Sequence, residues 1–154
     1  MSDDIARVAY ESALRSLDKQ ERVLDEIRSR TGVLLAASSL AVSFLGRSAS
    51  NHPASALVAT AATAFAVTIG ASVYVLLPKS TFFFSVSGRA VLEELYEFRS
   101  DVGEIRRRLV YDMERFWETN DRVMQKLFRA FRLASLALVI EVVLLLATVS
   151  DTLV

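Results

Sequence analysis

A single acidic residue, Glu141, interrupts an otherwise uncharged and largely apolar stretch of the chain, residues 133–150. Near the middle of a bilayer an ionised carboxylate costs about 2.5–3.5 kcal/mol on insertion scales, so Glu141 is expected to be protonated, paired, or turned towards protein or water. The other apolar stretches contain no basic partner. The predicted partners are the same carboxyl in neighbouring subunits, or hydroxyl groups such as those of Thr60, Thr63 and Thr68.

Two roles for Glu141 are open. A ring of ionised carboxylates around the axis of an oligomer would favour cations. A neutral Glu141 that is hydrogen-bonded to one neighbour would only hold helices together. Glutamine preserves the hydrogen bonds of the neutral form, so normal folding with lost conductance in Glu141→Gln indicates the first role, and unaltered conductance rejects it.

Three consecutive arginines form the densest basic cluster of the sequence: Arg106, Arg107 and Arg108. Guanidinium groups bind phosphates and carboxylates in bidentate geometry, so the cluster is a candidate site for a nucleotide, another small anion or an acidic protein partner. The alternative is a solvated helix face whose charge is balanced by nearby acids, namely Glu104, Asp112 and Glu114.

Other reactive chemistry is missing from the sequence. There is no cysteine, which excludes thiol catalysis and cysteine-bound metals. The single histidine, His52, falls in a short polar turn, and the five glycines are isolated rather than gathered in a phosphate-binding loop. The net charge of zero argues against a nucleic-acid binder. We predict a protein that is not an enzyme and uses no cofactor or metal ion.

The elements that position these residues are set by three uncharged apolar stretches, residues 31–46, 48–78 and 133–150 apart from Glu141. A helix needs about 20 residues at 1.5 Å each to cross a bilayer. The second stretch exceeds this length and the third is close to it. The first has 16 residues, so it must either recruit Ser48 and the residues beyond it or let Arg30 and Arg47 snorkel to the two interfaces. We predict an all-α integral membrane protein with three transmembrane helices and long cytoplasmic helices that form a helical bundle.

Basic residues predict the orientation, because Lys and Arg are retained on the cytoplasmic side of short flanking segments. They are frequent before the first apolar stretch and between the second and third, but only Arg47 lies between the first two and none follows Ser150. We expect a cytoplasmic N-terminus and an outer C-terminus in the inner (plasma) membrane. The predicted segments are a cytoplasmic amphipathic helix (1–30), a transmembrane hairpin (31–78), a cytoplasmic helical region (79–132), and a third crossing with a short outer tail (133–154).

The cytoplasmic segments carry helical patterns. Apolar residues recur at helical spacing over residues 10–27 without Gly or Pro, so the first helix is expected to run unbroken into the membrane. A further helix is expected through residues 91–96. The hairpin turn is expected at residues 51–53, and Pro78 is expected to end the second crossing.

The strongest pattern is a heptad seam in the second cytoplasmic region, formed by Leu109, Met113, Phe116, Asn120, Val123 and Leu127. Such spacing is typical of a helix that packs against partner helices, and it runs directly into the third crossing. A buried Asn120 between subunits would fix their register and number, because only alignments that pair its amide avoid an unsatisfied polar group. Packing on the N-terminal helix of the same subunit, with Asn120 reaching water, is the alternative.

Small residues line the second crossing at spacings of four, at Ala56, Thr60, Ala64, Thr68 and Ser72. Such faces let helix backbones approach closely, with Ser39 and Ser43 of the first crossing as predicted partners. The alternative is a hydroxyl-lined face beside a water-filled path.

The order of elements is a charged helix that ends at Arg28 and Arg30, a tight hairpin, a long charged helical region, a basic run at 129–132 and a final crossing. This layout resembles small prokaryotic membrane effectors of nucleotide second-messenger defence, namely the transmembrane effectors of cyclic-pyrimidine signalling and related SLATT-like domains. The resemblance implies antiviral defence through signal-triggered oligomerisation and disruption of the inner membrane.

We therefore expect a homo-oligomeric membrane effector that permeabilises the membrane or conducts ions in response to a cytoplasmic signal. Glu141 and the small-residue faces would line or brace the path, the seam would assemble subunits, and the three arginines would receive the signal. One alternative is a non-conducting, membrane-anchored scaffold that recruits a cytoplasmic partner. Another is an accessory subunit of a transporter.

Overall fold

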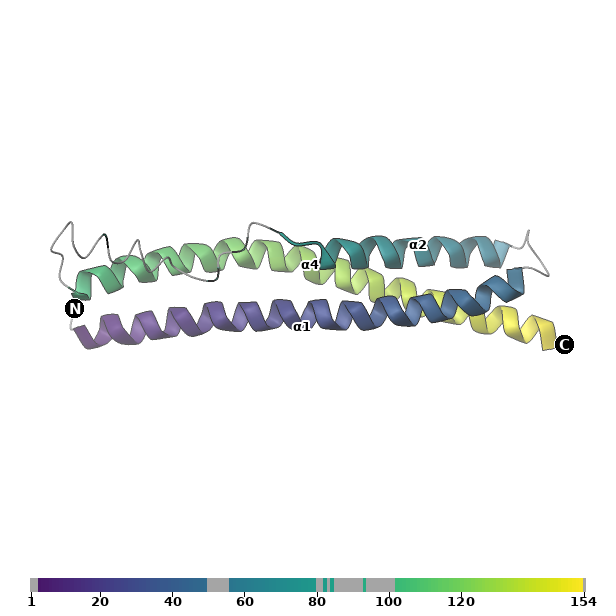
Figure 1. Ribbon diagram of the computed structural model, residues 1–154, viewed down its shortest axis with the longest axis horizontal. Coiled ribbons are helices and arrows are strands. Elements are labelled where there is room, and N and C mark those ends of the chain that lie inside the picture. The colour runs from purple at the N-terminus through teal and green to yellow at the C-terminus, as the bar shows by residue number, and fades with distance from the viewer. Residues whose placement is uncertain are drawn as a thin grey trace. The chain divides into compact units, whose positions relative to one another are not determined.

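The computed structural model describes residues 3–49, 56–79, 82, 84, 93 and 102–153. These residues form three helices and no strand: α1 (Asp3–Ala49), α2 (Ala56–Leu76) and α4 (Val102–Leu153) (Figure 1). The predicted all-α class is confirmed for this part of the chain. The hairpin turn at 51–53 and most of the helix expected at 91–96 lie outside the described residues.

α1 and α4 are long single helices of 47 and 52 residues. Neither contains proline, so no residue in their interiors lacks a backbone hydrogen-bond donor. The expectation that the first helix and the heptad helix each continue without a break into the following apolar stretch is confirmed. The segment boundaries that we placed at 30/31 and 132/133 therefore fall inside continuous helices.

α2 ends close to a proline. Its last residue is Leu76, and the amide of Leu77 still donates to the carbonyl of Val73 at 2.9 Å. Pro78 disfavours helical backbone at the residue before it and has no N–H to donate. The prediction that Pro78 terminates this helix is confirmed.

The chain divides into two compact units. Unit 1 contains Met1–Asp25 and Lys79–Gln125, and unit 2 contains Glu26–Pro78 and Lys126–Val154. The first part of α1 and the first part of α4 belong to unit 1. α2 and the remaining parts of α1 and α4 belong to unit 2.

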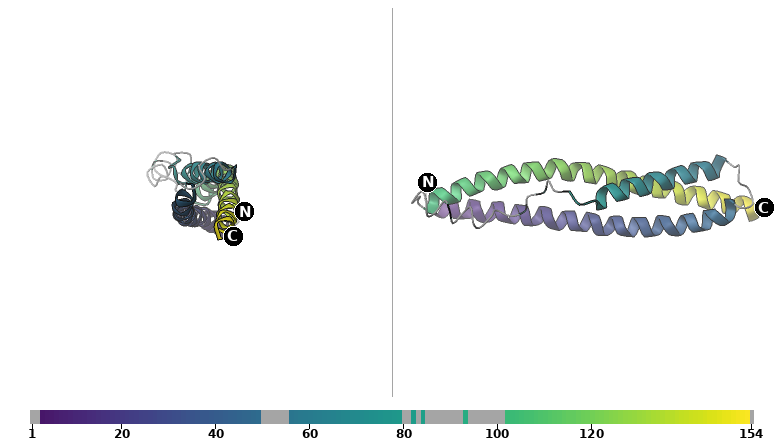
Figure 2. Two further views of the ribbon diagram at one scale, coloured as in Figure 1. Left: turned by 90° about the vertical axis from the view of Figure 1, so that its right-hand side faces the viewer. Right: turned by 45° about the horizontal axis from the view of Figure 1, so that its top comes forward.

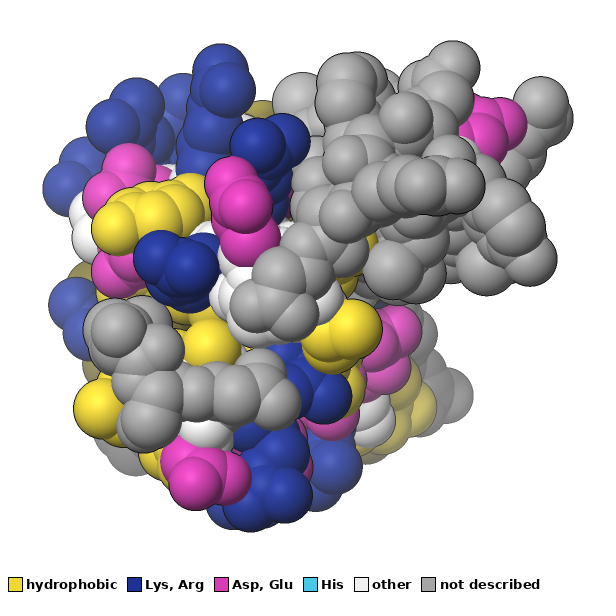
Figure 3. Space-filling view, turned by 90° about the vertical axis from the view of Figure 1, so that its left-hand side faces the viewer, with side chains coloured by type: hydrophobic (Ala, Val, Ile, Leu, Met, Phe, Trp, Pro, Cys, Tyr) yellow, Lys and Arg dark blue, Asp and Glu magenta, His cyan; other side chains and the backbone are white. Residues whose placement is uncertain are grey.

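Unit 1 is held together by apolar side chains between α1 and α4, which lie side by side in Figures 1 and 2. Leu17 of α1 is buried in one cluster with residues of α4, and further apolar side chains pack against it; the cluster consists of Leu17, Ile105, Leu109 and Met113. Full burial of side chains of this kind contributes about 1.5–3 kcal/mol each. The charged residues remain outside, and Figure 3 shows Lys and Arg mixed with Asp and Glu at the end where α1 and α4 begin. This is the polarity of a water-soluble helix pair.

Two of the described helices are long and apolar enough to cross a membrane, namely α2 and the part of α4 over Val102–Ala147. The same criterion, applied to the described residues, does not identify α1, whose uncharged stretch over 31–46 is 16 residues long. Of the three membrane-length helices that we predicted, two are therefore found.

Candidate functional site in unit 2

Unit 2 is largely small or polar inside and apolar outside, the reverse of unit 1. The buried residues of α2 lie on one face, at spacings of three and four: Ala61, Ala64, Thr68, Ser72 and Val75. α1 and α4 bury further small or polar residues in this unit: Thr31, Ser38, Ala41, Ala134, Ala137 and Glu141. Large apolar side chains point outwards, and Leu40, Leu136 and Leu146 are each at least 60% exposed. Small buried residues allow close helix contacts of the kind found in membrane bundles.

The carboxyl of Glu141 lies fully buried in this unit and is bonded to a hydroxyl of another helix. Ser38 of α1 donates its Oγ–H to Oε2 of Glu141 at 2.7 Å, and both side chains are 0% exposed. The contact joins α1 to α4 across 103 residues of sequence. We had expected hydroxyl partners from the second crossing, and Ser38 was not among them. Its position continues the buried stripe of α1 through Leu24, Ile27 and Thr31, which is the signal that would have found it.

Three buried polar atoms of unit 2 have no hydrogen-bond partner among the described residues. They are Nε of Arg28 on α1, the second carboxyl oxygen of Glu141, Oε1, and the hydroxyl oxygen of Ser72 on α2. An unsatisfied buried polar group costs about 1–3 kcal/mol, so native structures contain few of them. The interior of unit 2 therefore contains buried donor and acceptor atoms that could form further hydrogen bonds.

The three threonines that we proposed as intramembrane polar residues bond to their own helix. Thr68 is buried, and its Oγ1 donates to the carbonyl of Ala64 at 3.0 Å. Thr60 and Thr63 are exposed and donate to the carbonyls four residues earlier, at 2.8 and 2.9 Å. Hydroxyls in helix interiors commonly bond in this way. Only Thr68 shares the buried interior with Glu141, and the proposed pore-lining role of all three stays a prediction.

The heptad seam of α4 faces α1 of the same chain in unit 1. Leu109 and Met113 are buried in one cluster with Leu17, and Phe116 is partly buried against it. Val123 is half-buried in unit 1, and Leu127 is buried in unit 2. The interpretation in which the seam packs on the N-terminal helix is thus the arrangement found within one chain, and assembly of subunits through this seam stays a prediction.

Asn120 is fully buried and pairs with a second amide rather than with water. Its Nδ2 donates to Oε1 of Gln20 at 3.3 Å, and Nε2 of Gln20 donates to the backbone carbonyl of Trp117 at 3.1 Å. The expectation that Asn120 reaches water at the edge of the seam is wrong, because Gln20 is long enough to cover it. Gln20 was not identified from the sequence, although it lies between Leu17 and Leu24 on the seam of α1.

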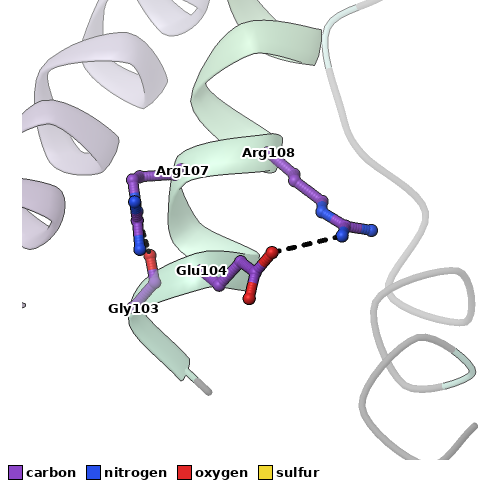
Figure 4. A network of polar contacts seen from close by, with 4 residues as sticks. All are labelled: Gly103, Glu104, Arg107 and Arg108. Carbon is purple, nitrogen blue, oxygen red and sulfur yellow. Dashed lines mark hydrogen bonds and ion pairs between the residues drawn. The ribbon is translucent and has the colours of Figure 1, made fainter. Parts of the chain in front are cut away.

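The arginine cluster does not converge on one point. Nε of Arg107 donates to the carbonyl of Gly103 at 3.4 Å, and Arg108 pairs with Glu104 at 3.3 Å. Figure 4 shows these two guanidinium groups on opposite sides of α4. Arg106, Arg107 and Arg108 therefore lie on different faces of one helix, which favours the solvated-face interpretation, and an anion site at the cluster stays a prediction. Among the described residues, no group of three His, Cys, Asp or Glu side chains could hold a metal ion.

Comparison with known proteins identifies no relative: no protein-family model, no curated protein and no solved structure matches the chain.

Proposed function

We propose that unit 2 is embedded in the inner (plasma) membrane, which the chain crosses three times with its N-terminus in the cytoplasm. Its reversed polarity supports this proposal, because large apolar side chains on the outside match a hydrocarbon surrounding, and small residues at the helix contacts are typical of membrane bundles. α2 and α4 have the length to span. In α1, the short stretch 31–46 provides the third crossing, since its buried residues Thr31, Ser38 and Ala41 belong to the same unit.

We further propose that the protein is a homo-oligomeric effector that permeabilises this membrane or conducts ions in response to a cytoplasmic signal. The observation that carries the proposal is the buried carboxyl of Glu141, which has one oxygen bonded to Ser38 and the other without a partner among the described residues. Ionisable groups within a membrane are costly and mark functional sites by default. Three crossings in one subunit are too few to enclose a wide aqueous path, so a path requires several subunits.

In the proposed mechanism, the Ser38–Glu141 contact holds the resting subunit closed. A signal received by unit 1 separates α1 from α4 in unit 2, and the carboxyl then turns towards neighbouring subunits. Glu141, together with the buried hydroxyls of Thr68 and Ser72, would line the resulting path and favour cations over anions. A buried group with unused hydrogen-bonding capacity suits such a change, because rearrangement satisfies an atom that the resting state leaves unpaired.

The test is membrane depolarisation in bacterial cells that express the full chain, read with a potential-sensitive dye, because it does not require the signal to be known. We expect Ser38→Ala to depolarise cells more than wild type and Glu141→Gln to suppress this effect in the double variant. Ser39→Ala is the matched control, since its exposed hydroxyl bonds only to the carbonyl of Leu35 on its own helix. Equal potentials in all variants, at matched amounts in the membrane, would overturn the proposal.

The second candidate function is a non-conducting anchor that recruits a cytoplasmic partner. It is favoured by the same contact, since a neutral Glu141 bonded to Ser38 would serve only to hold α1 and α4 together. An anchor needs no carboxyl, so Glu141→Leu would then leave partner recruitment and cell potential unchanged. If adding Glu141→Leu to Ser38→Ala abolished the depolarisation caused by Ser38→Ala, with normal insertion, the anchor would be excluded.

A further inference from the structure

A groove runs along one side of unit 1 between α1 and α4. Two adjacent cavities of about 430 and 290 Å³ share Ser16 and Trp117 in their walls. The α1 wall of the larger cavity carries small side chains, and the α4 wall carries larger ones; the lining residues used below are Ala9, Ser12, Ser16, Val110 and Trp117. The difference in side-chain size opens space between the two helices at the surface of unit 1.

The groove borders a second apolar stripe of α4, distinct from the heptad seam. Val110, Trp117 and Met124 are seven residues apart and line the groove, whereas the seam residues Leu109 and Asn120 face α1. Heptad spacing on a second face is typical of a helix that packs against more than one partner. Trp117, the single tryptophan of the chain, remains 41% exposed, and aromatic residues of this kind are common at the centres of interfaces.

The two rims of the groove carry opposite charge. On the α1 side, Lys19 lines the smaller cavity. It also borders a separate shallow depression together with Arg15, Asp18 and Arg22. On the α4 side, Glu114 and Asp121 line the groove, and Glu118 lies one turn from each of them. The groove therefore has Lys19 on its α1 edge and acidic residues on its α4 edge.

The charges on the two rims also lie at matching heights. Gln20 contacts Trp117 and Asn120, which are 97 and 100 residues further along the chain, so residues of α1 and α4 separated by about this number lie at one level. Each basic rim residue has an acidic rim residue 99 positions later: Arg15 with Glu114, Lys19 with Glu118, and Arg22 with Asp121. Arg15 pairs with Glu11 at 3.6 Å and Asp121 accepts from Gln125 at 2.8 Å, each on its own helix, so Lys19 and Glu118 are the pair best placed to meet residues of another subunit.

We propose that the groove binds the same groove of a second copy of the chain, in a parallel two-fold dimer. A two-fold axis along the helices places α1 of one subunit opposite α4 of the other at the same level, so each basic rim meets an acidic rim. Antiparallel face-to-face pairing would place the basic rim of one subunit on that of the other. The inference rests on the proposed membrane insertion, which gives both copies one direction.

The decisive experiment is a charge exchange in the full chain, reconstituted in phosphatidylcholine–phosphatidylglycerol vesicles. The dimer fraction is measured by energy transfer between donor- and acceptor-labelled chains as the protein-to-lipid ratio is lowered. Lys19→Glu and Glu118→Lys should each weaken dimerisation about tenfold, because each converts two attractive contacts per dimer into repulsive ones. The double variant should regain wild-type dimerisation. Arg115→Glu, two positions from Trp117 and hence on the far side of α4, is the control and should have no effect.

Two outcomes would overturn the dimer. One is a wild-type chain that stays monomeric at every protein-to-lipid ratio, as expected if another segment of the same chain fills the groove. The other is a double variant that remains as weak as the single variants, which would show that the two charges do not meet. Fluorescence provides a second readout, since Trp117 emission should shift to longer wavelength as wild-type dimers dissociate.

The failure of this inference and that of the proposed function give different results. A monomer that still depolarises cells contradicts the dimer alone. A dimer that regains its stability in the charge exchange, but never depolarises cells, supports this interface and contradicts the effector.

Discussion

The hydrogen bond between Ser38 and Glu141 gives the sharpest quantitative prediction, through the substitution Ser38→Ala. Alanine is smaller than serine by one hydroxyl group, so the change opens almost no cavity. It removes the donor from Oε2 of Glu141, whose Oε1 already has no partner among the described residues. Hydrogen bonds between membrane helices are worth about 0.6 kcal/mol on average and at most about 1.7 kcal/mol. Because this contact is 2.7 Å long and fully buried, we expect a loss towards the upper end, about 1–1.5 kcal/mol.

A matched control separates this effect from helix propensity. Alanine is a better helix former than serine by about 0.5 kcal/mol, which opposes the loss at position 38. Ser39→Ala has the same gain in helix propensity, but the Ser39 hydroxyl is exposed and donates to the carbonyl of Leu35 in its own helix. The free energy of unfolding, measured by SDS titration in mixed micelles, should therefore be about 1–1.5 kcal/mol lower for Ser38→Ala than for Ser39→Ala.

A double-variant cycle completes the test. In a Glu141→Leu background the acceptor is gone, so Ser38→Ala should no longer cost stability relative to Ser39→Ala. Equal free energies for the two alanine variants in the wild-type background would refute the buried contact between α1 and α4. A cost that persists in the Glu141→Leu background would place the effect of Ser38 elsewhere.

Three further predictions concern unit 1. Asn120→Leu should destabilise the chain by about 1–3 kcal/mol, because Gln20 is left buried without its amide partner, whereas the double variant with Gln20→Leu should recover most of this loss in thermal unfolding followed by circular dichroism. Leu17→Ala should cost about 2–5 kcal/mol, and Leu14→Ala, at a side chain that is 40% exposed, should cost much less in the same assay. Arg108→Ala should change stability by less than about 1 kcal/mol in the same assay, because its ion pair with Glu104 is exposed.

The helices themselves were largely predictable from local features of the sequence. Periodic apolar residues without proline indicated that α1 and α4 would each continue into the following apolar stretch, and Pro78 marked the end of α2. These features depend on backbone geometry within a few residues, so they can be predicted from the local sequence alone. The seam position of Asn120 was predictable for the same reason.

The polar partners were not predictable, because they depend on which helices face each other. Hydroxyls of α2 were expected beside Glu141, but the hydroxyls of Thr60, Thr63 and Thr68 donate to backbone carbonyls of their own helix. The sequence distinguishes Ser38 from other serines only by its place on the buried stripe of α1. Gln20 was missed because glutamine is usually exposed, and only the facing amide of Asn120 makes its burial favourable.

α1 and α4 each pass without a break from unit 1 into unit 2, so both units bury polar contacts between the same two helices. Gln20 of α1 bonds to Asn120 and to the carbonyl of Trp117 in unit 1, and Ser38 of α1 bonds to Glu141 in unit 2. Within unit 2, a shift of α1 along α4 by one turn, about 5.4 Å, would separate Ser38 from Glu141. Packed helix faces have discrete registers, so such a shift would be a step between two defined positions rather than a gradual displacement.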